Sequence, residues 1–220
     1  MLDFDVTVSP PSMQATNGLK DEVAAYKRRR IVEEAVDLFY TQGYESTTLD
    51  AVAERLNVTK PFIYSYFKNK GEVLAAICET GITLVLEALE ETLNKDASAT
   101  DQLKLISEQT ARIIISYYKY TSVYTHEEKN LDPKDARRIR ELRHQYDVRL
   151  RVVLEKGKAS GEFDFEDSSH TSIWVSGVLT WIAYWYREGG HWSSTEVVMD
   201  AIKVVMRIVG LREPGAKRIK

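Results

Sequence analysis

The sequence predicts an all-α protein, and three observations lead to that prediction. Apolar residues recur at helical spacing along almost all of the chain after Asn17, and strand-like alternation is almost absent. Residues that favour helix starts, such as Thr48, Pro133 and Ser193, precede these apolar segments. A chain of 220 residues that is 44% hydrophobic is also long enough to bury a proper core. We therefore expect a folded, helical protein.

Two helices are predicted after an N-terminal tail. The first ends near Thr41, before Gly43, and its apolar face consists of Ile31, Ala35, Leu38 and Phe39. Thr47 or Thr48 can cap the second, short helix, whose apolar face consists of Leu49, Val52, Ala53 and Leu56. Both helices present one apolar side and therefore need a common partner.

A tight turn and a third helix follow. Asn57 tolerates a positive φ better than other non-glycine residues, so the chain can reverse there before Thr59 caps a helix that begins at Lys60. An advance of 100° per residue turns Ile63 and Phe67 towards the first two helices. Three helices with this turn predict a helix-turn-helix unit, whose last helix enters the major groove of DNA.

The third helix and the residues after it read KPFIYSYFKNK, residues 60–70, with four aromatic side chains, three lysines and no acid. Lysine and tyrosine at a groove wall reach phosphate oxygens, and we expect this of Lys60, Tyr64, Lys68 and Lys70. The outward side, where bases are read, is expected to hold Pro61, Phe62, Ser65 and Tyr66. Simple packing remains the alternative for the two outward aromatic rings. Whether the basic cluster at residues 27–30 touches DNA stays open.

Further helices are predicted in the rest of the chain. One long helix follows Asn69, two more lie at residues 101–120 and around His126, and another begins at Pro133 and ends at Gly157 or Gly161. After a GEFDFED loop, the last two are expected at residues 168–186 and 195–209, the second with a Ser193–Glu196 capping box. These last two helices are apolar on more than one side, which predicts a homodimer formed through them, with burial in one subunit as the alternative.

The middle of the chain is rich in aromatic side chains with polar tips, which suit either a core or a small-ligand pocket. We expect a pocket lined by Tyr117, Tyr118, Tyr124, Arg143, Tyr146, Trp174, Trp181 and Trp185. The partner implied by such a pocket is a small-molecule effector.

Residues 31–74 resemble the N-terminal domain of TetR-type transcriptional regulators. The resemblance is carried by Ala35, Phe39, the pair Gly43-Tyr44, the pair Thr47-Thr48, Ala53, Tyr64 and the segment FKNK at residues 67–70. It implies a homodimer that binds double-stranded DNA and is released by a ligand. Carried over by position, it implies phosphate contacts from Thr48, Thr59, Lys60, Tyr64 and Lys70, and base contacts from Pro61, Phe62, Ser65 and Tyr66. Asn57 and Gly71 depart from the usual glycine and acid of that pattern.

The end of the chain, WYREGG followed by HWSSTEVVMDAIKVVMRIVGL, resembles those TetR-type regulators that respond to acyl-CoA thioesters. The CoA phosphates would be bound by Arg137, Arg138, Arg140 and Arg143. The alternative is that these arginines belong to an ordinary exposed helix face. The domains expected are a tail at residues 1–19, a DNA-binding domain at 20–71, a ligand-binding and dimerisation domain at 72–212, and a tail at 213–220.

Other function classes have weaker support. The sequence lacks a glycine-rich phosphate loop, GxSxG and CxxC, and its four histidines have no ligand spacing, so we expect no enzyme, catalytic residue, metal or cofactor. An architectural DNA-binding protein without an effector remains the alternative. The chain has a single cysteine and no apolar run near the ~18 residues of a membrane span, which predicts a cytoplasmic protein. The cysteine, Cys78, is expected to lie in the core.

Overall fold

The computed structural model describes residues 18–212, and this part of the chain is helical without a strand. The predicted tails fall outside it, apart from Gly18 and Leu19. In chain order the elements are α1 (Leu19–Gln42), α2 (Leu49–Arg55), α3 (Lys60–Tyr64), α4 (Lys70–Leu93), α5 (Ala99–Ser116), α6 (Tyr118–Glu127), the 3₁₀ turn η1 (Glu128–Asn130), α7 (Pro133–Ser160), α8 (Ser168–Trp185) and α9 (Ser194–Ile208). The all-α prediction is confirmed.

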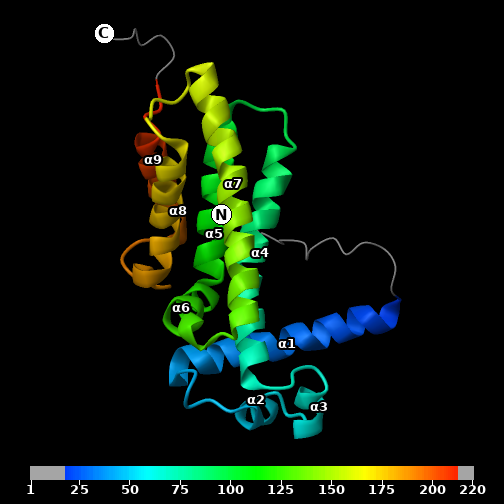
Figure 1. Cartoon of the computed structure of the whole chain (residues 1–220). Helices are drawn as coiled ribbons and strands as arrows, with labels where there is room; N and C mark the ends of the chain where they lie inside the picture. The colour runs from blue at the N-terminus through cyan, green and yellow to red at the C-terminus, as the bar shows by residue number, and fades with distance from the viewer. Residues whose placement is uncertain (1–17, 213–220) are drawn as a thin grey trace.

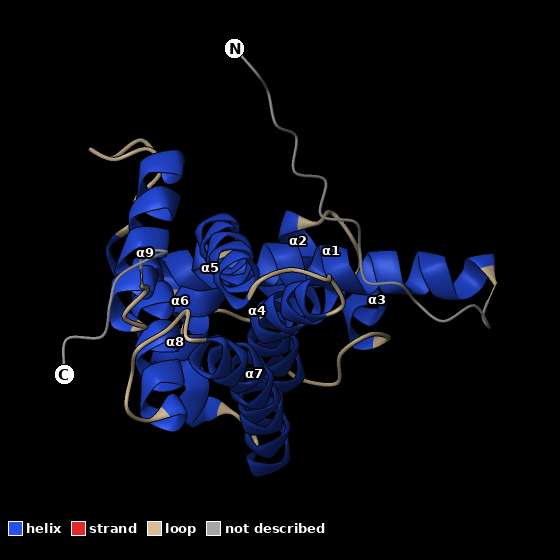
Figure 2. Ribbon diagram, turned by 90° about the horizontal axis from the view of Figure 1, so that it is seen from above, coloured by secondary structure: helices blue, strands red, loops and turns tan. Residues whose placement is uncertain are grey.

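Figure 1 shows α1, α2 and α3 gathered at one end of the molecule. The helices α4, α5, α7, α8 and α9 run away from that end side by side, and α6 lies between them and α1. Seen from above in Figure 2, α1 extends sideways beyond the bundle. None of the described helices is long and apolar enough to span a membrane.

Three of the predicted helix starts are observed with their capping hydrogen bonds. Thr48 Oγ1 accepts from Ala51 N at 3.1 Å, and Asn69 Oδ1 accepts from Glu72 N at 2.9 Å. At the start of α9 the hydroxyl and the backbone N–H of Ser193 both pair with Glu196, which completes the capping box. The helix α7 ends at Ser160 because Gly161 takes a left-handed φ of 78°, which glycine adopts without a steric cost.

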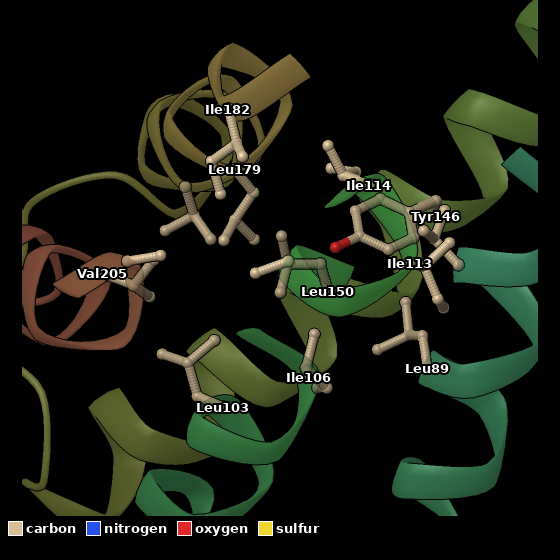
Figure 3. Close-up of a cluster of buried hydrophobic side chains, with 14 of the residues drawn as sticks. Leu89, Leu103, Ile106, Ile113, Ile114, Tyr146, Leu150, Leu179, Ile182 and Val205 are labelled. Carbon is tan, nitrogen blue, oxygen red and sulfur yellow. The ribbon is translucent and has the colours of Figure 1, made fainter. Parts of the chain in front are cut away.

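Two hydrophobic clusters form the core. The smaller one joins α1, α2 and α3 to the first turns of α4, with Ile31, Ile63 and Phe67 fully buried. The larger one joins the second half of α4 to α5, α7, α8 and α9, and Figure 3 shows part of it, including Leu103, Leu150, Leu179 and Val205 from four different helices.

The helices α4 and α7 belong to both clusters. In α4, Val73 to Cys78 pack in the smaller cluster and Val85 to Leu89 in the larger one. In α7, Ile139 packs with the first cluster, whereas Leu150 and Leu154 pack with the second. A helix is stiff along its axis, so these two elements connect the α1–α3 unit to the bundle directly. Cys78 is buried, as predicted.

Candidate nucleic-acid interface and ligand cavity

The turn between α2 and α3 has the predicted geometry. Asn57 has a φ of 53°, and it is the non-glycine residue with positive φ in the described chain. Val58 N donates to Ala53 O at 3.0 Å, which closes the turn against α2. Thr59 stands at the N-cap of α3, but its side chain makes no capping hydrogen bond, so its hydroxyl is not used in the helix start. The turn therefore sets the orientation of α3 relative to α2.

The α3 helix has a buried side and an exposed side. Ile63 and Phe67 are buried against α1 and α2, as predicted. Pro61, Tyr64 and Ser65 are exposed, and the exposed fraction of Tyr64 is 51%. Exposed aromatic and polar side chains on a helix held this way are available for contact with a groove.

The prediction that Phe62 and Tyr66 point directly away from the core is wrong. Both are half-buried, they pack against the smaller cluster, and their ring centroids lie 5.2 Å apart. The physical reason is that both rings pack on the smaller cluster and on each other, and Lys27 of α1 lies 5.7 Å from the centroid of the Phe62 ring, so this flank is partly covered. Phe62 and Tyr66 therefore form the border of the exposed side of α3.

Two of the predicted phosphate-binding lysines have partners within the chain. Lys60 Nζ lies 2.5 Å from Asp50 Oδ2, and this hydrogen bond and charge raise the pKa of Lys60. Lys70 Nζ donates to Tyr44 O at 2.6 Å and to Glu45 O at 3.2 Å. Both lysines therefore also hold the α1–α3 unit together. Their contact with DNA stays a prediction, as it does for the other eight residues.

A cavity of about 710 Å³ lies in the bundle between α4, α5, α6, α7 and α8. We call it the central cavity. Its apolar wall includes Ile82, Val85, Ile114, Ile139, Ile173 and Trp181, and its polar wall includes Thr110, Tyr120, Thr121, Tyr124, Thr125, Glu128, Arg143, His144, Tyr146, Asp147, Ser176, Thr180 and Tyr184. The volume and the mixture of apolar and hydroxyl groups are typical of a small-ligand site.

Hydrogen-bonding groups in the central cavity are held in defined states. Burial raises the pKa values of the Tyr120 and Tyr146 hydroxyls, which are protonated at neutral pH even at the ordinary pKa of a tyrosine. Arg143 NH1 donates to the Tyr124 hydroxyl at 2.6 Å. Ser176 Oγ is buried and has no hydrogen-bond partner among the described residues. A ligand can therefore gain a hydrogen bond at Ser176 without displacing one within the protein.

The structure brings together half of the predicted pocket residues. Tyr124, Arg143, Tyr146 and Trp181 line the central cavity, whereas Tyr117, Tyr118, Trp174 and Trp185 do not. Tyr117 packs its ring on Tyr120, and Tyr118 packs on Tyr40 of α1. The two tyrosines do not line the cavity because α5 ends before residue 117, where a continuous helix is predicted. The break directs Tyr117 against the larger cluster and Tyr118 towards α1.

Trp174 and Trp185 line a different hollow, of about 530 Å³, between α8 and α9. This hollow lies in a largely apolar surface, which we call the α8–α9 face. The face consists of Trp174, Val178, Trp181, Trp185, Trp192 and Val204. The exposed fraction of Trp174 is 68% and that of Trp181 is 60%. Exposed apolar surfaces of this size are often found where proteins bind partners or ligands.

Hydroxyl-bearing residues of α6 and α8 that were not predicted also line the cavity: Tyr120, Thr121 and Thr125 of α6, and Ser176, Thr180 and Tyr184 of α8. Together with the predicted Tyr124, the three residues of α6 stand at i, i+1, i+4 and i+5, which is the spacing of one helix face. This spacing is visible in the sequence and was the available signal. The described residues contain no cluster of ligands for a metal ion.

Comparison with known proteins gives the chain a family. Residues 96–209 match the family described as "Tetracyclin repressor-like, C-terminal domain", and residues 31–77 match "Bacterial regulatory proteins, tetR family". A fatty acid metabolism regulator protein from Bacillus subtilis (strain 168) is 25% identical over 136 residues, which cover 62% of this chain and 70% of that protein.

Solved structures with the same fold include the TetR family transcriptional regulator PfmR from Thermus thermophilus. It is 28% identical, has a TM-score of 0.76, and the match covers 84% of this chain and 100% of that chain. AibR, solved in complex with isovaleryl coenzyme A and operator DNA, is 21% identical with a TM-score of 0.72, covering 81% and 97%. With its helix-turn-helix unit and its helical C-terminal domain, the chain belongs to the TetR family of non-enzymatic, DNA-binding transcriptional regulators.

Proposed function

We propose that the protein is a homodimeric repressor that a small hydrophobic effector releases from a palindromic operator. The observation that carries this proposal is the position of α6. The helix lines the central cavity with Tyr120 and Tyr124, and it also packs against α1 of the helix-turn-helix unit. An effector that shifts α6 therefore acts on the DNA-binding unit through a direct contact.

In this proposal residues 20–71 bind DNA, and residues 72–212 bind the effector and the second subunit. The α3 helix lies in the major groove. Bases face Pro61, Phe62, Ser65 and Tyr66, and phosphates face Thr48, Thr59, Lys60, Tyr64 and Lys70. The exposure of Pro61, Tyr64 and Ser65 supports this arrangement. Lys60 and Lys70 would exchange part of their present hydrogen bonds for phosphate oxygens, which are stronger acceptors because they are charged.

The homodimer is proposed to form through the α8–α9 face. One helix-turn-helix unit makes too few contacts to specify a site, so a two-fold partner is needed. The exposed Trp174, Trp181 and Trp192 support this surface, because aromatic side chains dominate the centres of protein interfaces. Light scattering after size exclusion tests it, with Val204→Glu on α9 as the disrupting variant. A monomeric wild-type chain at micromolar concentration would contradict the dimer.

Acyl-CoA thioesters are the effector class we propose. The apolar wall of the central cavity suits an acyl chain, and Arg137 and Arg140 on α7 are exposed cations without an acid partner in the described chain, available for CoA phosphates. Arg138 is less available, because it pairs with Glu79 at 2.8 Å. Two similar proteins support the same effector class: the Bacillus subtilis relative is a fatty acid metabolism regulator, and AibR was solved with isovaleryl coenzyme A.

Release of DNA by ligand is the experiment that tests the proposed function. An operator is first selected from a pool of random duplexes, and its release is then followed by fluorescence anisotropy with acyl-CoAs of increasing chain length, free CoA and free fatty acids. Stabilisation by free hydrophobic compounds but not by acyl-CoAs in a thermal-shift assay would overturn the effector class. DNA binding that no ligand releases would favour the architectural alternative.

Gly81 offers a variant that closes the cavity from within. It lies on α4 in the cavity wall, and a Cβ added there meets nothing within 4 Å. Gly81→Leu is expected to fill part of the cavity, to keep DNA binding and to abolish the response to the effector. Gly81→Ala is the matched control, since it adds one methyl group and leaves most of the volume free.

A further inference from the structure

The first half of α1 contributes nothing to the core. All the buried residues of α1 lie between Ile31 and Phe39, whereas residues 19–30 are exposed or half-buried. Figures 1 and 2 show this segment extending sideways from the α1–α3 unit. An ordered helix with no buried face is free to use its side chains for another contact.

The basic cluster in this segment divides into two pairs with different surroundings. Arg30 pairs with Glu33 at 2.7 Å and with Glu34 at 3.3 Å, and Arg29 lies 3.8 Å from Glu33. Lys27 and Arg28 have no acid partner within residues 18–212. The charge of Arg29 and Arg30 is therefore neutralised by local carboxylates, and the charge of Lys27 and Arg28 is not.

Lys27 and Arg28 also lie beside α3 and the residues that directly follow it. Lys27 Nζ is 5.7 Å from the centroid of the Phe62 ring, and Arg28 Cζ is 4.5 Å from the centroid of the Phe67 ring. Phe62 borders the exposed side of α3, next to Pro61. Lys27 therefore stands at the edge of the surface that we place in the DNA groove, and Arg28, which is exposed, is the next residue along α1.

The dimensions of DNA make this position significant. The major groove is about 12 Å wide, so a helix in it has a phosphate backbone on either side within the reach of a lysine or arginine side chain. Cations at the edge of α3 meet that backbone when α3 enters the groove. Two unpaired cations there would each displace condensed counterions from DNA.

We propose that Lys27 and Arg28 form a phosphate-binding site on α1, next to the groove that α3 occupies. The inference rests on the proposed placement of α3 in the major groove. It assigns to α1 a contact that carries affinity for any sequence and no base preference. The competing explanation is that both cations only pack on the aromatic rings and stabilise α3.

The test compares two double variants that each remove two positive charges from neighbouring positions of the same helix. Lys27→Gln with Arg28→Gln removes the unpaired cations, and Arg29→Gln with Arg30→Gln removes the paired ones. Binding to a labelled random-sequence duplex is measured over a series of salt concentrations. We expect the first double variant to lower the slope of log K against log salt by about 0.9 for each phosphate that is no longer neutralised, and the second to change it much less.

A third variant separates charge from packing. Lys27→Arg with Arg28→Lys keeps both charges but alters both ring contacts, and it is expected to keep the wild-type salt slope. Equal slopes for wild type and the first double variant, or equal reductions in the two charge-removing variants, would overturn the inference while leaving DNA binding intact. If the wild-type chain binds no duplex, the proposed function and this inference both fail.

Discussion

Lys119 Nζ on α6 lies 2.6 Å from Asp37 Oδ1 on α1. This ion pair joins a helix that lines the central cavity to a helix of the DNA-binding unit. Asp37 also approaches Arg55 of α2, at 3.6 Å from Oδ2 to NH2, and Glu34 holds the same arginine at 3.0 Å. These ion pairs connect α6 to α1 and, through Asp37 and Arg55, to α2.

Replacement of Lys119 is expected to weaken the communication between the cavity and DNA. Lys119→Met keeps the apolar stem but removes the ion pair, so the effector should still bind while releasing less DNA. Allosteric coupling between two sites is typically about 1–3 kcal/mol, and we expect this variant to reduce it. Titration of the effector with and without operator measures this, and Lys104→Gln on α5 is the control. Unchanged coupling in Lys119→Met would contradict the role of the pair.

Lys70→Ala is expected to lower both stability and DNA affinity. The ammonium group satisfies the carbonyl of Tyr44 at 2.6 Å and lies 4.2 Å from the centroid of its ring. Removal of these interactions should cost about 1–3 kcal/mol of unfolding free energy. A phosphate contact would also lower the salt slope by about 0.9. Chemical denaturation and anisotropy measure the two effects, with Lys104→Ala, an exposed lysine on α5 outside the predicted DNA surface, as control. An unchanged slope would exclude Lys70 from the phosphate contacts.

Two serines on α8 should respond in opposite ways to alanine. Ser176 Oγ is buried without a partner among the described residues, so Ser176→Ala should raise the unfolding free energy by about 1 kcal/mol. Ser172 Oγ donates to Asp147 Oδ1 at 2.5 Å, so Ser172→Ala should lower it by about 1–3 kcal/mol. Urea denaturation of both variants measures the difference. A decrease in stability in Ser176→Ala would show that its hydroxyl already has a partner in solution.

Gly157→Ala is expected to destabilise the protein even though alanine favours helices. A Cβ at this position in α7 would lie 2.1 Å from Cδ2 of Phe163, whose ring is buried. Such overpacking typically costs about 1–3 kcal/mol. Gly81→Ala on α4, where the added methyl group has open space, should instead add about 0.5–1 kcal/mol. Thermal unfolding measures both. Recovery in Gly157→Ala with Phe163→Leu would identify the ring as the cause.

Glu162 is expected to produce part of the acid sensitivity of the fold. Burial alone would raise its pKa, but hydrogen bonds from Ser160 and from the backbone at Thr100 lower it to about 2 from 4.5. A folded-state pKa below the unfolded value stabilises the protein above pH 4.5, and this stability disappears as the pH falls towards about 2. Unfolding followed in this range should show a flatter pH dependence for Glu162→Gln. The exposed Glu155→Gln is the control and should keep the wild-type profile.

The sequence predicted the helical elements closely because local signals define them. Thr48, Asn57, Asn69 and the capping box at Ser193 each act within a few residues, so they are visible without knowledge of the fold. The helix-turn-helix unit followed from these signals, and the family match confirms it.

The side chains of the candidate sites were predicted less well. The orientation of Phe62 and Tyr66 depends on α1 lying alongside α3, a contact between segments more than thirty positions apart in the sequence, and helical spacing alone does not give it. Tyr117 and Tyr118 were assigned to the cavity because their residue type suits a pocket. The break between α5 and α6 turned them away from it.

The sequence by itself determined most of the helices and their ends, the turn at Asn57 and the buried side of α3, because these follow from local propensity and from the spacing of apolar residues. It did not reveal the helix break at residue 117. Only the tertiary structure decided which polar groups meet across helices. It placed Trp181 in the wall of the central cavity, whereas Trp174 and Trp185 line only the hollow on the α8–α9 face. It also divided the basic cluster: Lys27 and Arg28 lie on aromatic rings, and Arg29 and Arg30 pair with carboxylates. The reason is that a side chain's partners are set by the packing of whole helices, which no single segment encodes.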